Sequence, residues 1–318
     1  MMTGSTQPAG PEISVVVPSY NCLGCLEELC SRLKRVLTDL GPSFEIVIVD
    51  DRSPDNSWPL VEALSMRFPE VRGVRLSRNF GQHIAITAGI ARSRGNYVVL
   101  MDCDLQDPPE RIPDLYAAVK QGYDLVLGRR VERNHSWFRT LGAKMYFRLL
   151  SKLTSEPQDG SYGTFSILSR RVADAYLKFT ERDRHFLFIL RWLGFNCGTI
   201  EYVHEERYEG RSSYGLGKLI KHAVGGLFFQ TSVFLMWIVR LGLIFTALSF
   251  VLGGFLVYRY LVSAVLPGWT SLSVAILFST GLVLASVGAV GIYVSKIFEA
   301  SKGRPLYLVD VECGCELS

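Results

Sequence analysis

The sequence predicts an α/β domain with a mostly parallel sheet, followed by two helices that cross a membrane. Two observations favour this fold class. Short, continuous apolar runs alternate with helical patterns over the first 130 residues. Further along, two long tracts contain no Asp, Glu, Lys or Arg. The composition agrees, because 48% hydrophobic with 20% charged residues suits a soluble part joined to a membrane part. The net charge of +4 gives no indication of a nucleic-acid partner.

Five apolar runs are expected as strands, and four helical patterns lie between them. The strands are expected at 13–17, 44–49, 71–76, 97–101 and 123–127, and the helices at 23–40, 58–68, 84–92 and 112–120. Continuously apolar strands are typical of a parallel sheet with helices on both faces. Neither a G-x-G-x-x-G nor a P-loop motif occurs at the required place, which disfavours dinucleotide dehydrogenases and P-loop NTPases.

The acidic cluster after the fourth run is the main candidate for chemistry. Asp102 and Asp104 are two residues apart, so an extended backbone places both carboxylates on one face. Two crowded carboxylates repel unless a cation lies between them, and Mg²⁺ is usually shared with substrate phosphates. A metal–diphosphate site is therefore predicted, with Gln106 as a further oxygen ligand. The alternative is a solvated acidic turn, which Asp50 and Asp51 at a neighbouring strand end make less favoured.

The two charge-free tracts predict a membrane hairpin with spans at 239–262 and 272–294. A buried core hairpin is the alternative. Lys and Arg residues flank the outer ends of both spans, so the positive-inside rule places the catalytic domain and both termini in the cytoplasm of a multi-pass inner or plasma membrane protein. Residues 1–10 are expected to be disordered, and the catalytic domain is expected at 11–210. An interfacial region at 211–238, two membrane helices at 239–295 and a C-terminal tail at 296–318 would follow.

Two segments resemble basic amphipathic helices for the membrane surface. They span 137–153 and 216–228, with apolar residues at helical spacing and Lys or Arg opposite. The alternative for each is an ordinary helix docked on the sheet. The seven cysteines are scattered in a chain expected to be cytoplasmic, so free thiols are predicted.

Four sequence runs carry a family resemblance. The runs at 17–21 (Val-Pro-Ser-Tyr-Asn), 48–55, 77–82 and 102–110 resemble glycosyltransferase family 2, and most of all its polyprenyl-phosphate glycosyltransferases. The resemblance continues through 210–214 to 304–308. It implies a GT-A (Rossmann-like) domain that transfers one sugar, with inversion, from a nucleotide diphosphate sugar, expected to be UDP-linked. The implied acceptor is an undecaprenyl- or dolichyl-type phosphate, used for cell-envelope glycan or lipid modification.

The resemblance also implies roles for individual residues. The nucleotide-sugar site would comprise Pro18, Tyr20, Asn21, Asp50, Asp51, Arg78, Gln82 and Asp102. Mg²⁺ or Mn²⁺ would be held by Asp102, Asp104 and Gln106. The catalytic set would be Asp102, Asp104, Arg130, Arg139 and Thr164, and the acceptor phosphate would meet Arg130, Arg139 and Arg211. The implied partners are the donor, a polyprenyl phosphate and the bilayer, without nucleic acid; a homo-oligomer is left open.

This chain departs from the family pattern at several positions. Thr164 stands where several relatives carry an Asp that is treated as the catalytic base, while Cys22, Arg52 and Ser213 replace a common Glu, Gly and Lys. A phosphate monoester is mostly dianionic at neutral pH, so such an acceptor needs no base. We therefore expect positioning, metal and arginine to carry catalysis. Two alternatives are a family 2 transferase acting on a sugar hydroxyl and a weakened scaffold that binds lipid phosphate.

Overall fold

The computed structural model describes residues 10–131, 161–181, 184–203, 251, 258, 262 and 268–314. The chain divides into two compact units. The first, which we call the sheet unit, holds residues 1–147, 159–213 and 305–318; the second holds 148–158 and 214–304. Several predictions fall outside the described residues, namely the N-terminal segment up to residue 9, the helices at 137–153 and 216–228, and nearly all of the span at 239–262.

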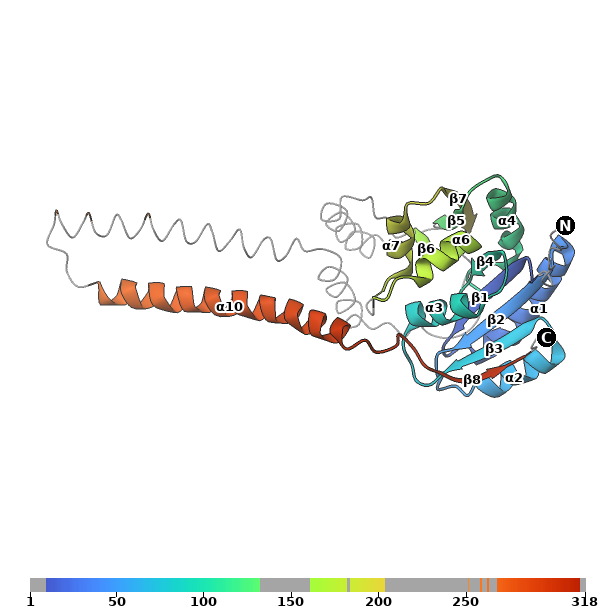
Figure 1. Cartoon of the computed structure of the whole chain (residues 1–318), viewed down its shortest axis with the longest axis horizontal. Helices are drawn as coiled ribbons and strands as arrows, with labels where there is room; N and C mark the ends of the chain where they lie inside the picture. The colour runs from blue at the N-terminus through green and yellow to red at the C-terminus, as the bar shows by residue number, and fades with distance from the viewer. Residues whose placement is uncertain are drawn as a thin grey trace, which may run out of the picture. The chain divides into compact units, whose positions relative to one another are not determined.

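The sheet unit is built on one eight-stranded sheet with the order β7-β5-β6-β4-β1-β2-β3-β8 (Figure 1). Parallel pairing joins β4, β1, β2 and β3, and also joins β5 to β7. β6 lies antiparallel between β4 and β5, and β8 pairs antiparallel with β3. The strands are β1 Ile13–Ser19, β2 Phe44–Asp50, β3 Val71–Leu76, β4 Tyr97–Leu100, β5 Leu125–Val131, β6 Tyr162–Ser169, β7 Cys197–Val203 and β8 Val309–Cys313.

Helices cover both faces of this sheet (Figure 1). They are α1 Leu23–Leu40, α2 Trp58–Arg67, α3 Gln82–Arg92, α4 Ile112–Lys120, α6 Arg170–Leu177 and α7 Phe186–Leu193, with the short 3-10 helix η1 Pro109–Arg111 before α4. One core lies under α1, α2 and α4 and takes Val15 and Val17 from β1. The other lies under α3, α6 and α7 and takes Val16 from the same strand. Burial on both faces explains why the strands are continuously apolar.

The predicted α/β fold with a mostly parallel sheet is confirmed. All five predicted strands and all four predicted helices are present, and the strand expected at 123–127 runs as β5 Leu125–Val131. The sequence analysis did not predict β6, β7 or β8. β7 alternates buried and exposed positions along much of its length, and β8 is mostly exposed, so neither has the continuously apolar pattern of the central strands.

Helix α1 shows how local sequence and packing agree. Its buried residues recur at helical spacing, including Leu26, Leu29, Leu33 and Leu37. The helix ends where Gly41 adopts φ +96° and donates its N–H to the Leu37 carbonyl over 3.2 Å. Burying one such leucine contributes about 1.5–3 kcal/mol. Together these side chains fix the helix that begins directly after the loop at the end of β1.

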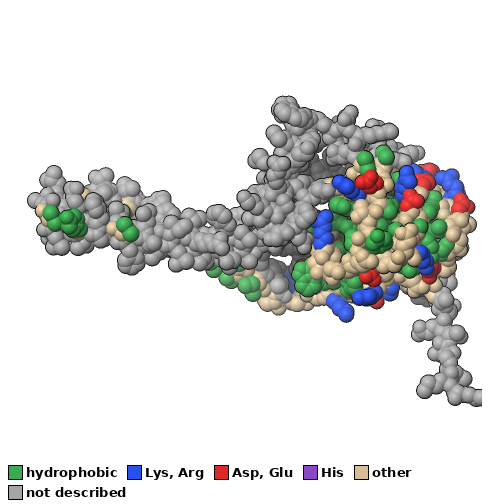
Figure 2. Space-filling model, turned by 90° about the horizontal axis from the view of Figure 1, so that it is seen from above, with side chains coloured by type: hydrophobic (Ala, Val, Ile, Leu, Met, Phe, Trp, Pro, Cys, Tyr) green, Lys and Arg blue, Asp and Glu red, His purple; other side chains and the backbone are tan. Residues whose placement is uncertain are grey.

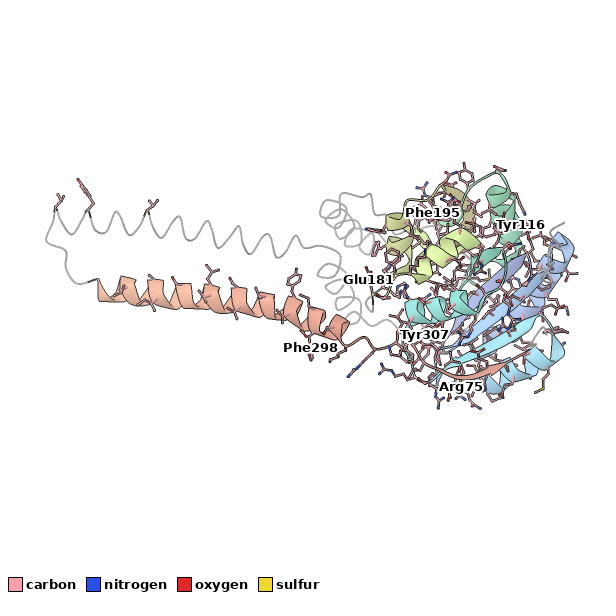
Figure 3. All side chains as sticks on the ribbon, in the orientation of Figure 1. Arg75, Tyr116, Glu181, Phe195, Phe298 and Tyr307 are labelled. Atoms are coloured by element: carbon pink, nitrogen blue, oxygen red, sulfur yellow. A yellow bond between two sulfur atoms is a disulfide. The ribbon has the colours of Figure 1, made fainter. Side chains whose placement is uncertain are left out.

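The described part of the second unit is dominated by α10 Trp269–Ser301, which contains the predicted span at 272–294. Its exposed apolar side chains include Ile276, Val283, Val294 and Phe298, the last labelled in Figure 3. Over the residues that the structure describes, no helix is both long enough and apolar enough to cross a membrane.

Beyond α10 the chain re-enters the sheet unit. Tyr307 packs against the core under α3 and leads into β8 (Figure 3). β8 then covers the edge of β3, and its charged residues Asp310 and Glu312 form ion pairs with Arg52 and Arg92. On the face shown in Figure 2, basic and acidic side chains are interspersed over the sheet unit.

Candidate active site

The loops that follow β1, β2 and β4 meet at one edge of the sheet. Each contains a non-glycine residue in the left-handed region: Asn21 at φ 59°, Arg52 at φ 54° and Leu105 at φ 60°. Such backbone is costly for most side chains, and it occurs preferentially at functional sites. Leu105 is held there because its side chain is buried in the core. The Gln106 N–H also donates to Asp104 Oδ1 over 3.2 Å, which tightens the same turn.

The loops after β1 and β2 are joined by hydrogen bonds. The Asn21 N–H donates to Ser53 Oγ over 2.7 Å, and the Leu23 N–H donates to Asp55 Oδ2 over 2.9 Å. These bonds fix the run that carries three of the predicted nucleotide-site residues, Pro18, Tyr20 and Asn21. Tyr20 remains 49% exposed, so its ring is accessible to a ligand. Ser53 and Asp55 are supporting residues that the sequence analysis did not single out.

Asp51 organises the loop after β3. Its two carboxylate oxygens accept the N–H groups of Phe80, over 2.7 Å, and Gly81, over 2.8 Å. Gly81 has φ +96°, a conformation that favours glycine, and it leads directly into α3. Burial raises the pKa of the Asp51 carboxyl, although these two hydrogen bonds oppose that shift. Asp51 therefore supports the segment that contains Arg78 and Gln82.

Asp50 is buried at the end of β2. Its Oδ1 accepts the Ser53 N–H over 3.0 Å, and its Oδ2 is 3.6 Å from Nε of Arg75, the β3 residue labelled in Figure 3. Burial raises its pKa, partly offset by the Ser53 bond and the Arg75 charge. The exposed Arg78 packs its guanidinium over the Phe80 ring at 4.7 Å. The predicted nucleotide-site residues thus lie on neighbouring loops.

Asp102 is the point where three elements converge. Gln82 Nε2 at the start of α3 donates to Asp102 Oδ1 over 2.7 Å, and Thr164 Oγ1 on β6 donates to the same oxygen over 2.8 Å. Burial of its carboxylate, followed by the negative charge of Asp107, raises the pKa of Asp102 to about 6. The Asp104 charge acts in the same direction, while the Thr164 bond and the Arg130 charge oppose it. The predicted residues Gln82, Asp102 and Thr164 are therefore in direct contact.

Arg130 lies beside this acidic centre in a second hydrogen-bonded group. Its Nη2 is 3.4 Å from Oδ1 of the fully buried Asp107, and its Nε donates to the Tyr202 hydroxyl over 3.1 Å. Tyr202 donates in turn to Asp107 Oδ1 over 2.6 Å. Burial lowers the pKa of Arg130, but the charge of Asp107 and the Tyr202 hydroxyl outweigh it, so the pKa is raised overall. Tyr202 was missed by the sequence analysis, since a single tyrosine in an alternating strand carries no chemical signal.

The acidic centre fits a divalent cation that is completed by substrate. Both hydrogen bonds to Asp102 end on Oδ1, which leaves Oδ2 for a metal ion, and Asp104 follows two residues later. Burial first, and carboxylate repulsion second, raise the Asp102 pKa by disfavouring its charged form, and a bound cation favours that charged form again. In the described part of the chain, no group of three or more His, Cys, Asp or Glu side chains is placed to hold a metal ion. Mg²⁺ and Mn²⁺ suit such an open set, because substrate phosphates and water supply the remaining ligands.

The prediction of free cysteines is wrong for two of the seven. Cys22, at the start of α1, and Cys103, between the two aspartates, form a disulfide with Cα atoms 6.3 Å apart. The pairing of β1 with β4 brings these loops together, a relationship that the scattered spacing does not reveal. Among the described cysteines, Cys30, Cys197 and Cys313 are free thiols. The predicted phosphate-binding residues Arg139 and Arg211 lie outside the described residues.

Comparison with known proteins finds relatives that align with nearly the whole chain. The chain is 36% identical over 308 residues to an uncharacterized glycosyltransferase of Synechocystis sp., with 96% of each chain covered. It is 33% identical over 310 residues to the undecaprenyl-phosphate 4-deoxy-4-formamido-L-arabinose transferase of Proteus mirabilis, covering 95% of this chain and 94% of that one.

A solved structure shares the GT-A-like fold. Glucosyl-3-phosphoglycerate synthase from Mycobacterium tuberculosis, in complex with Mn²⁺, UDP and phosphoglyceric acid, superposes with a TM-score of 0.51 at 19% identity, covering 70% of this chain and 79% of that one. The model of glycosyl transferase family 2 matches residues 14–177, just over half of the 318 residues. With the site at the strand ends and relatives aligned over nearly the whole chain, the protein is a glycosyltransferase that belongs to glycosyl transferase family 2.

Proposed function

We propose that this protein transfers one sugar from a UDP-sugar to a polyprenyl phosphate, with inversion at the anomeric carbon. The observation that carries the proposal is the hydroxyl of Thr164 beside Asp102, at a position where the family resemblance implies an Asp that acts as the base. A sugar hydroxyl must lose a proton to attack and needs a positioned base, whereas a phosphate monoester is already mostly dianionic at neutral pH. The Proteus mirabilis relative named for undecaprenyl phosphate supports the same acceptor class.

In the proposed reaction, an oxygen of the acceptor phosphate attacks the anomeric carbon from the face opposite the leaving group. The bond between that carbon and the diphosphate oxygen breaks, and the nucleoside diphosphate leaves with the electron pair. Tyr20, Asn21 and the Asp50–Asp51 loop would hold the nucleoside end of the donor. Gln82 and Thr164 orient the Asp102 carboxylate, while Arg130 places a positive charge next to it.

A divalent cation, Mg²⁺ or Mn²⁺, would be held by Asp102, Asp104 and Gln106. When bound, it would offset the negative charge that develops on the leaving diphosphate. The Asx turn at Asp104, in which the Gln106 N–H donates to Asp104 Oδ1, fixes the backbone between two of these residues. Support for a metal comes from this oxygen-rich set and from the carboxylate repulsion at Asp102.

The proposed place of action is the cytoplasmic face of the cell membrane. The sequence supports it with two long tracts that lack charged residues and with Lys and Arg at their outer ends. The exposed apolar side chains along α10 are also suited to lipid contact. A lipid-phosphate acceptor requires such a location, because its phosphate emerges at the membrane surface.

The proposal is tested by incubating the purified full-length protein with undecaprenyl phosphate, Mg²⁺ or Mn²⁺ and a panel of UDP-sugars, with mass spectrometry of the lipid. The expected product is a lipid phosphate that carries one additional sugar, and Asp102→Asn is the inactive control. Transfer to a sugar hydroxyl but not to lipid phosphate would contradict the acceptor. Binding of lipid phosphate without transfer or hydrolysis of any nucleotide sugar would favour the scaffold alternative.

A further inference from the structure

Arg130 is held by a buried group that joins three elements. Asp107 comes from the loop before η1, Arg130 from β5 and Tyr202 from β7. Asp107 is fully buried, and the Tyr202 hydroxyl lies between the other two residues, donating to Asp107 over 2.6 Å and accepting from Arg130 Nε over 3.1 Å. The direct Arg130–Asp107 approach is longer, at 3.4 Å. The tyrosine hydroxyl therefore makes the closer contacts within this group.

The other side of the guanidinium is shaped by Gly163. A Cβ atom at this glycine would lie 2.6 Å from Arg130 Nη2 and 2.8 Å from its Cζ, so only a residue without a side chain lets the guanidinium lie flat there. Gly163 directly precedes Thr164, which bonds Asp102. In the described part of the chain, Nη1 of Arg130 has no hydrogen-bond partner. Tyr202 and Asp107 thus hold one edge of the guanidinium, and Gly163 lies against one of its faces.

From this geometry we propose that Tyr202 is a positioning residue that holds Arg130 in place for a substrate phosphate at Asp102. An arginine side chain carries roughly 2 kcal/mol of rotamer entropy, so a group that fixes it beforehand favours phosphate binding. Without the tyrosine hydroxyl, Arg130 loses its contact at 3.1 Å and keeps only the longer approach to Asp107 at 3.4 Å. The inference rests on the proposed function only in requiring a substrate phosphate at this site.

Tyr202→Phe is the first test, with Tyr176→Phe as its matched control. Tyr176 is equally buried, but its hydroxyl pairs with Thr87 over 3.2 Å in the other core. Binding is measured by calorimetry for the nucleoside diphosphate that wild type binds most tightly among UDP, GDP, CDP and TDP, with the nucleoside as reference. We expect Tyr202→Phe to weaken diphosphate binding about tenfold and nucleoside binding less than twofold. Tyr176→Phe should leave both unchanged. Equal effects of the two variants on diphosphate binding would overturn the proposal.

A double-mutant cycle separates positioning from a structural role. In an Arg130→Lys background, Tyr202→Phe should change diphosphate affinity less than twofold, because lysine lacks the Nε–H group that donates to the Tyr202 hydroxyl. Additive losses would overturn the proposal. Gly163→Ala should displace the guanidinium and reproduce the selective loss while the Tyr202–Asp107 bond remains. Wild-type diphosphate affinity in that variant would also contradict it.

Kinetics identify which phosphate Arg130 meets. An increased KM for the donor points to its diphosphate, and an increased KM for the lipid points to the acceptor phosphate; a fall in kcat alone would contradict a binding role. The calorimetric test needs no acceptor, so a wrong acceptor class would leave it valid.

Discussion

Thr164 on β6 donates its hydroxyl hydrogen to Oδ1 of Asp102 over 2.8 Å, the same oxygen that Gln82 reaches from α3. The antiparallel strand β6 thereby contributes directly to a centre otherwise built from the start of α3 and the loop after the parallel strand β4. A hydroxyl in this place orients the carboxylate but has no basic group to accept a proton at neutral pH.

Replacing Thr164 with Ala should reduce kcat less than about tenfold, because one orienting hydrogen bond is lost and no base is removed. Steady-state transfer to polyprenyl phosphate measures this. Thr164→Val, which keeps the shape without the hydroxyl, should behave in the same way. A loss of several hundredfold would show that the hydroxyl has a chemical part in the reaction.

Asp102→Asn should reduce transfer at least about a thousandfold, since the amide cannot supply the charge that holds a divalent cation. Chelation of wild type should have the same effect, reversible by Mg²⁺ or Mn²⁺. Circular dichroism of the variant should match wild type. Metal-independent transfer, or wild-type rates in the variant, would refute the metal site.

Breaking the Cys22–Cys103 disulfide should lower the free energy of unfolding by about 2–4 kcal/mol, because it closes a long loop between cysteines 81 residues apart. Denaturant unfolding with and without a dithiol reductant measures this for wild type. The double variant Cys22→Ser/Cys103→Ser should resemble reduced wild type and should not respond to the reductant. Alkylation of both cysteines in unreduced folded protein would contradict the disulfide.

Arg52→Gly should be more stable than Asp310→Asn. Both variants lose the exposed Arg52–Asp310 ion pair, which spans 2.5 Å and contributes at most about 1 kcal/mol. Only Arg52→Gly also relieves the left-handed backbone at φ 54°, worth roughly 1–2 kcal/mol. Thermal unfolding of the two variants ranks them. Because both lack the ion pair, the opposite order would show that glycine at position 52 does not relieve backbone strain.

Glu12 should make folding stability fall in acid. Lys120 and Asn96 each donate a hydrogen bond of 2.8 Å to the Glu12 carboxylate, and these bonds lower its pKa below the usual 4.5 in the folded state. As the pH falls, Glu12 is therefore protonated in the unfolded chain before it is protonated in the folded protein. Its contribution to the free energy of unfolding is present above about pH 4.5 and is lost as the pH falls through the lowered pKa. Glu12→Gln should make the free energy of unfolding depend less on pH in that range. An unchanged acid dependence would contradict this assignment.

Much of the fold follows from sequence because the central strands are buried on both faces. The run at 44–49 therefore has a clear apolar signature, and α1 has a clear helical period. The partners of individual residues do not follow in the same way. Thr164 could be singled out from its motif, but its contact with Asp102 depends on β6 inserting antiparallel beside β4. Tyr202 and the Cys22–Cys103 pair likewise depend on which strands are neighbours.

Because β8 follows α10 in the chain but pairs with β3 in the sheet, proteolysis within α10 would leave β8 bound. A single proteolytic cut within α10 would separate β8 from the other seven strands covalently, yet the β3–β8 ladder and the ion pairs of Asp310 and Glu312 would still bind the two fragments to each other. The two fragments of such a cleaved protein are therefore expected to complement each other by reassociating. Loss of the shorter fragment would uncover the edge of β3, whose open hydrogen-bonding groups favour association with other chains.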